Sequence, residues 1–232
     1  MKTLATQLKW EFKLLQKNNI ISISFAVTAI YGVLLFFLRD IEVLDKVLVS
    51  MVLNDPTVIG YFFIALAVYA EMKHKILQAI FTSPLNLHTY LIAKTIALTI
   101  IGTLCSIGLA VSVRGMDFDL VSYVFGSFGI CLLSTFLGIY VLTFTNEFLK
   151  FAMLSFPVFL TFANVPLLQY LGVIDMGWFS YAFPIQGSID LIDFSVSGKE
   201  IQHVLAYAST IFWIPIFYWM AYKRFSANVV YK

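Results

Sequence analysis

Charged residues are scarce in this 232-residue sequence: only 12% are Asp, Glu, Lys or Arg, whereas 60% are hydrophobic. Soluble proteins average about 25% charged and about 45–50% apolar residues. A soluble core of this size cannot hide the excess apolar surface, so the composition predicts that lipid surrounds the chain. Long stretches such as 20–38 and 120–144 contain no charge. Because they are continuous rather than alternating, they favour membrane-spanning helices over a barrel.

Residues that carry chemistry are also few. Cys105 and Cys131 lie in apolar runs without CxxC or metal-type spacing, so we expect small buried side chains. His74, His88 and His203 show no metal-like spacing with one another or with cysteine, so no metal site is predicted. The sequence has no G-x-x-x-x-G-K-[ST] loop for ATP phosphates. We therefore expect neither an enzyme nor a bound cofactor in this chain, and no nucleic-acid partner.

The hydrophobic runs predict an all-α membrane protein with six spans in one domain, residues 1–232. The second run is short for the roughly 20 residues that a span needs, so we expect it to extend past Asp55 or Glu71. The fifth contains Pro157 and Pro166 and is expected to kink. The predicted spans are 19–38, 56–70, 91–113, 120–144, 151–172 and 201–222.

The distribution of positive charge predicts the orientation of these spans. With a cytoplasmic N-terminus, eleven of the 15 Lys and Arg residues fall inside and four outside. Such a bias is typical of cytoplasmic loops, so both termini are expected in the cytoplasm. The polar segments 71–94 and 145–150 then lie inside, and 39–55, 114–119 and 173–200 lie outside.

The first residues form an amphipathic pattern. Apolar side chains recur at helical spacing with lysines on the more polar side, which predicts a helix at the lipid interface. This helix either anchors the first span or acts as a lever for a cytoplasmic partner, and the sequence fits both interpretations. The apolar set is Leu4, Leu8, Phe12 and Leu15, beside Trp10, and the lysines are Lys9, Lys13 and Lys17.

The segment 71–94 is too long for a simple turn between spans. It begins with the charged and basic residues Glu71, Lys73, His74 and Lys75, continues as an apolar helical stripe, and breaks at Ser83-Pro84. Lys94 then lies at the edge of the third span, where a lysine is costly unless it pairs or reaches water. From this pattern alone, the segment is either a docking element or an interfacial loop without a partner.

The residues of this segment resemble the signature of ABC-2-type permeases, the membrane subunits of a class of ATP-binding-cassette transporters that are mostly exporters. The matching residues are Glu71, Leu77, Ser83, Pro84, Leu85, Tyr90, Leu91 and Lys94, with departures at His74, Lys75, Ile76 and Gln78. The resemblance extends to six spans, cytoplasmic termini and a first amphipathic helix. It also implies that 173–200, with Pro184, forms short re-entrant helices before the last span.

The resemblance implies a multi-pass protein of the bacterial cytoplasmic (inner) membrane, with a coupling helix that docks on a separate ATPase subunit. That subunit would bind ATP and Mg, and a second permease subunit, identical or paralogous, would complete the transporter in membrane lipid. The expected function is export of a hydrophobic drug, peptide or lipid-like molecule; the alternative is a non-transporting scaffold or sensor that binds such an ATPase. The residues assigned to ATPase coupling are Glu71, Lys73, Lys75, Leu77, Gln78, Ser83, Pro84, Leu85, Tyr90 and Lys94.

Four other polar positions have alternative interpretations. Asp190 and Asp193 are expected in a solvated outer loop, the alternative being an outer substrate vestibule. Asn164 is expected to be buried in the fifth span, where an interhelical hydrogen bond is favoured over a substrate contact. Glu147 and Lys150 predict a local surface pair of small energetic value, the alternative being a second contact with the ATPase.

Overall fold

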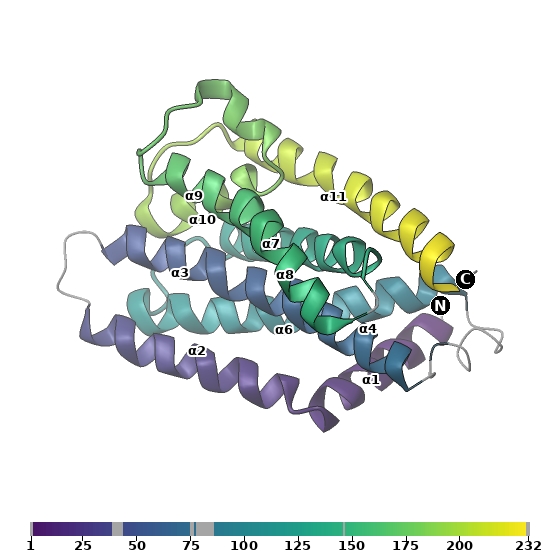
Figure 1. The fold of residues 1–232 in the computed structure, drawn as a ribbon. Helices are drawn as coiled ribbons and strands as arrows, with labels where there is room; N and C mark the ends of the chain where they lie inside the picture. The colour runs from purple at the N-terminus through teal and green to yellow at the C-terminus, as the bar shows by residue number, and fades with distance from the viewer. Residues whose placement is uncertain (1, 39–43, 75–76, 78–85, 146, 231–232) are drawn as a thin grey trace.

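The computed structural model describes residues 2–38, 44–74, 77, 86–145 and 147–230, which form a bundle of helices (Figure 1). Within these residues, six helical segments are long and apolar enough to cross a membrane, which confirms the all-α membrane fold. The elements are α1 Lys2–Lys17, α2 Ile20–Phe37, α3 Leu44–Val58, η1 Ile59–Phe63, α4 Ile64–Lys73, α6 Leu87–Arg114, α7 Leu120–Leu142, α8 Phe148–Phe159, η2 Leu160–Asn164, α9 Val165–Tyr170, η3 Gly177–Ala182, α10 Gln186–Ser197, α11 His203–Phe225 and η4 Ser226–Val230.

Both chain ends lie at the same end of the bundle, as an even number of spans requires (Figure 1). We call this the terminal end; it also carries α1, the last turn of α4 and the first turn of α6. The opposite end, where α2 ends and α3 begins, is called the loop end. Which end faces the cytoplasm remains the prediction made from the charges.

The second span extends past both Asp55 and Glu71, as the shortness of its apolar run predicted. The helix begins at Leu44 and continues through α3, η1 and α4 to Lys73, so most of 39–55 is not an outer loop. Leu48, Val52 and their neighbours are fully buried because α3 packs against α6 and α7. The assignment of 39–55 to an outer loop was wrong because the charged Asp45, Lys46 and Asp55 interrupt the apolar run.

Helix α7 is the centre of the bundle and packs against α3, α6, α10 and α11. Close approach depends on small residues, as is usual between membrane helices. A Cβ atom at Gly138 would lie 2.4 Å from the backbone oxygen of Tyr61, and one at Gly126 would lie 2.7 Å from that of Ser188. Both cysteines are also fully buried between these helices, which confirms their prediction.

The fifth span, which was expected to kink, departs from regular α-helical geometry between its two prolines. Residues Leu160–Asn164 form a π-helical turn that joins α8 to α9. A wider turn of this kind accommodates the backbone groups that a proline leaves unbonded. Asn164, however, is partly exposed rather than buried, so the expected buried amide is not found.

The segment 173–200 contains the two short helices η3 and α10 before the last span. Helix α10 folds back against α7, α11 and α3 instead of remaining in solvent. Asp193 is therefore 6% exposed and Asp190 is half-buried, so the expected solvated loop was wrong for both acids. Burial also raises the pKa of Asp190.

Candidate coupling site

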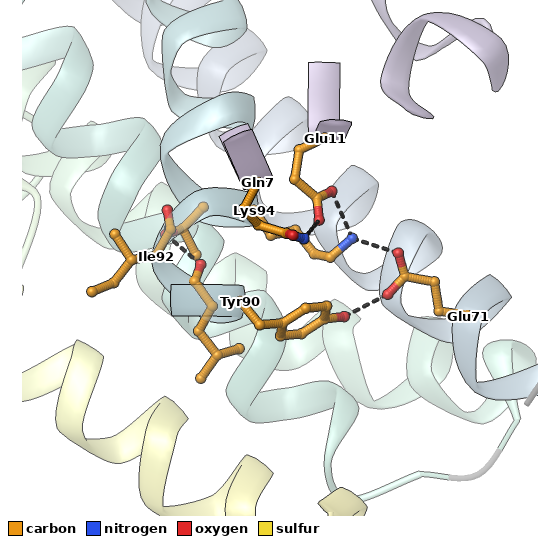
Figure 2. Close-up of polar contacts among 8 residues, drawn as sticks. Gln7, Glu11, Glu71, Tyr90, Ile92 and Lys94 are labelled. Atoms are coloured by element: carbon orange, nitrogen blue, oxygen red, sulfur yellow. Dashed lines mark hydrogen bonds and ion pairs between the residues drawn. The ribbon is translucent and has the colours of Figure 1, made fainter. Parts of the chain in front are cut away.

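Three residues of the segment 71–94 meet in the interior at the terminal end. The Lys94 ammonium lies 2.7 Å from Glu71 Oε1, and the Tyr90 hydroxyl donates to Glu71 Oε2 over 2.5 Å (Figure 2). Tyr90 and Lys94 are four residues apart and therefore share one face of α6. The last turn of α4 is thereby joined to the first turns of α6.

Helix α1 supplies the fourth member of the cluster. Lys94 Nζ lies 2.9 Å from Glu11 Oε2, and the Gln7 amide donates to Glu11 Oε1 over 3.2 Å (Figure 2). We call Glu11, Glu71, Tyr90 and Lys94 the buried ionic cluster. It connects three helices, and two of its members, Glu11 and Lys94, are 83 residues apart along the chain.

Glu11 was not predicted as a site residue, although the sequence carries a signal for it. It is spaced three residues from Leu8 and four from Leu15, so it lies on the apolar stripe of α1. Leu15 is buried and Leu8 packs against the core. An acid on an apolar stripe indicates a buried partner, because an unpaired charge there would be strongly unfavourable.

The buried ionic cluster is almost closed to solvent. The side chains of Lys94 and Glu11 are 2% and 1% exposed, and that of Glu71 is 8% exposed. Burial raises the pKa of Glu11; the adjacent Lys94 opposes this shift, whereas the second carboxylate, Glu71, adds to it. Two carboxylates thus share one ammonium, and burial favours the protonated form of Glu11.

A buried cluster of this kind fixes the relative positions of its helices more than it adds to the net stability of the fold. Desolvation of buried ions offsets most of their attraction, whereas removal of one partner costs about 3–5 kcal/mol. Lys94 therefore resists separation from either carboxylate. Displacement of the end of α4 would consequently be passed to α6 and α1.

Aromatic contacts tie the same turns of α6 to the last span. His88 stacks on Tyr222 with ring centroids 4.0 Å apart, and its Nδ1 lies 2.5 Å from the Tyr218 hydroxyl oxygen. The ring of Tyr90 stacks on Phe225 at 6.1 Å. The start of α6 is thus fixed to α1, α4 and α11 together.

Comparison with known families agrees with this arrangement. Residues 2–232 match the fluoroquinolones export permease protein family. The chain belongs to this family. It is an ABC-2-type permease family, which confirms the resemblance found in the segment 71–94. A search of curated proteins found no match to the chain.

Membership makes the chain a membrane-embedded export permease of an ABC transporter, a transport subunit rather than an enzyme. Such a transporter includes an ATPase partner. The six apolar helices agree with a multi-pass membrane protein.

The predicted coupling residues of this permease divide into two groups. Glu71, Leu77, Tyr90 and Lys94 are buried within the chain, whereas Lys73 is exposed on the last turn of α4, and its neighbour His74 is exposed directly after that helix. Lys94 pairs with carboxylates instead of reaching water. Lys75, Gln78, Ser83, Pro84 and Leu85 lie outside the described residues.

Glu147 and Lys150, near the start of α8, have the geometry predicted for a weak surface contact. Lys150 Nζ lies 3.4 Å from Glu147 Oε1, and both side chains are about two-thirds exposed. Exposed pairs of this kind contribute about 0–1 kcal/mol. The pair therefore provides a matched control for the buried ionic cluster.

Proposed function

We propose that this permease is the transmembrane subunit of an ABC exporter for fluoroquinolone-type drugs in the bacterial cytoplasmic membrane. A separate ATPase binds ATP and Mg and drives export, and a second permease chain, identical or paralogous, completes the transporter. The family description and the absence of an ATP-binding loop from the sequence support this assignment. The excess of Lys and Arg at the terminal end supports its cytoplasmic placement.

The buried ionic cluster is the observation that carries the proposed coupling. The ATPase contacts the segment 71–94 from the cytoplasm, and its closure on ATP displaces the end of α4. Because Lys94 holds Glu71 and Glu11 at 2.7 and 2.9 Å, α6 and α1 move with α4. Lys94 is thus a positioning residue that transmits the movement without touching the ATPase.

The exposed residues of the segment have the complementary role. Lys73 and His74 face outward beside the end of α4, where they are accessible to a partner. Positive charge there fits an acidic rim on the ATPase. Docking and transmission are consequently assigned to different residues, and this division can be tested.

The test uses the permease co-expressed with its ATPase. Two quantities are measured: the ATPase recovered on tagged permease, and the ATP hydrolysis stimulated by a fluoroquinolone in membrane vesicles. Lys73→Glu should reduce recovery, whereas Lys94→Met should retain recovery and lose the stimulation. Lys199→Glu at the loop end is the matched control for recovery of the ATPase, and Lys150→Met is the matched control for stimulation.

Each alternative has its own outcome. If a fluoroquinolone stimulates ATP hydrolysis by the Lys94→Met complex as strongly as by the unmodified complex, transmission through the cluster is contradicted. ATPase recovery without stimulation by any fluoroquinolone in the unmodified complex would instead support a scaffold or sensor that binds the ATPase.

A further inference from the structure

An open apolar cavity of about 850 Å³ lies at the loop end between α2, α3 and the end of α9. One stripe of α3 forms most of its wall, and this volume is typical of sites for drug-sized ligands. Tyr31 of α2 and Leu171 complete the lining. The residues from α3 are Lys46, Val47, Ser50, Met51, Asn54 and Val58.

A second, more polar cavity of about 490 Å³ adjoins the first. The two cavities share Lys46 and Leu171, so Lys46 borders both. Asp45 and Asp193 also line the polar cavity, together with Tyr170, Gly172, Ser197 and Lys199. An apolar space therefore opens beside a charged one.

The charges in the polar cavity are unequally compensated. Asp45 is neutralised by Arg114, whose Nη2 lies 2.5 Å from both carboxylate oxygens. Within the described part of the chain, the Asp193 carboxylate receives only hydroxyl donors, from Tyr170 at 3.0 Å and Ser197 at 3.2 Å. Among the described residues, neither Asp193 nor Lys46 forms an ion pair.

An uncompensated acid that is 6% exposed is unfavourable unless a cation reaches it. A bound ammonium group would supply that cation, and a bound carboxylate would pair with Lys46. The adjoining apolar cavity would take the ring system that separates the two groups. The combination fits an aromatic molecule with one charge of each sign.

We propose that the two cavities form one binding site for aromatic zwitterions, with the ring in the apolar cavity, the carboxylate at Lys46 and the ammonium at Asp193. The site rests on the proposed export of fluoroquinolones, which are aromatic carboxylic acids and in many cases carry a basic amine. Its place at the loop end makes it a site on the release side of the permease.

Binding is measured on the full-length permease in lipid nanodiscs, without the ATPase, from the intrinsic fluorescence of ciprofloxacin. This probe carries both charges; its methyl ester lacks the carboxylate charge and its N-acetyl derivative lacks the ammonium charge. Each derivative should bind the unmodified permease about tenfold or more weakly than ciprofloxacin, because each loses a charge-assisted contact. This comparison needs no variant and is independent of folding defects.

Two variants then assign each charge to its residue. Lys46→Gln should weaken ciprofloxacin about tenfold but leave the methyl ester unchanged, and Asp193→Asn should weaken ciprofloxacin but leave the N-acetyl derivative unchanged. Lys150→Gln and Asp117→Asn, which make the same charge changes outside the cavities, should bind all three probes normally. Met51→Trp, which fills the apolar cavity, should reduce binding of all three.

The opposite results would overturn the site. Equal losses for acid and ester in Lys46→Gln, or unchanged ciprofloxacin binding in both charge variants, would show that these residues do not recognise the ligand. Unchanged binding in Met51→Trp would assign the apolar cavity to lipid chains. Fluoroquinolone-stimulated hydrolysis in the unmodified complex would persist in either case, so failure of this site is distinguishable from failure of the proposed function.

Discussion

Replacing Lys94 by methionine removes the cation that Glu11 and Glu71 share while keeping an unbranched side chain of similar length. Both carboxylates then face each other in a region that is almost closed to solvent. Among the described residues, Glu11 and Glu71 form ion pairs only with Lys94, so neither carboxylate has another cation once Lys94 is replaced. We therefore expect a large loss of stability.

The size of the loss follows from the burial. Removing one partner of a buried ion pair costs about 3–5 kcal/mol. For a protein of this length, 1 kcal/mol changes Tm by about 2–4 °C, so Lys94→Met should lower Tm by about 6–20 °C. Combining Lys94→Met with Glu11→Gln and Glu71→Gln should recover most of the loss, because no uncompensated charge stays buried.

Thermal unfolding of the purified permease in detergent measures this effect. The control is Lys150→Met, which removes an exposed partner at 3.4 Å and should change the unfolding free energy by at most about 1 kcal/mol. A decrease in Tm for Lys94→Met no larger than that of the control would refute the reasoning. A triple variant no more stable than Lys94→Met would also refute it.

Three further predictions concern single contacts. Tyr90→Phe removes the hydroxyl that donates to Glu71 and should cost about 1.5–3 kcal/mol in a denaturant titration; an unchanged midpoint would contradict this. Gly138→Ala places a Cβ atom 2.4 Å from the Tyr61 backbone oxygen, so it should lower Tm and the yield of folded protein, whereas undiminished yield would count against close α7 packing. Burial raises the pKa of Glu11 above 4.5, so the folded state binds more protons and stability should fall as pH rises above about 4.5 through the folded pKa; Glu11→Gln should flatten this fall, and parallel curves would argue against it.

The positions of most spans could be predicted from hydropathy alone. Lipid imposes a minimum length and a low charge on each span, so runs such as 120–144 mark their helices within a few residues. The exception is instructive: α3 carries Asp45, Lys46 and Asp55, yet it is helical from Leu44. Asp45 pairs with Arg114, and Asp55 accepts a hydrogen bond from Thr28, so neighbouring helices supply polar partners for these two acids.

The coupling segment was only partly predictable. Its charge pattern and its Ser-Pro break indicated the location and the family, because these features are local in the sequence. One of the two partners of Lys94 was not local, since Glu11 lies on another helix far along the chain. Likewise, Asp193 was expected in solvent, and only the packing of α10 against α7 buries it.

The amino-acid sequence by itself indicated that lipid surrounds this permease, how many spans it has and to which family it belongs. These properties follow from apolar runs, charge bias and a local motif, which depend on neighbours along the chain. Tertiary structure alone decided which charges are buried, which are paired and which border a cavity. Those properties depend on the distance between residues of different helices. From the sequence, Lys94 at the edge of the third span could either pair or reach water; because α1, α4 and α6 meet there, it is the centre of the buried ionic cluster.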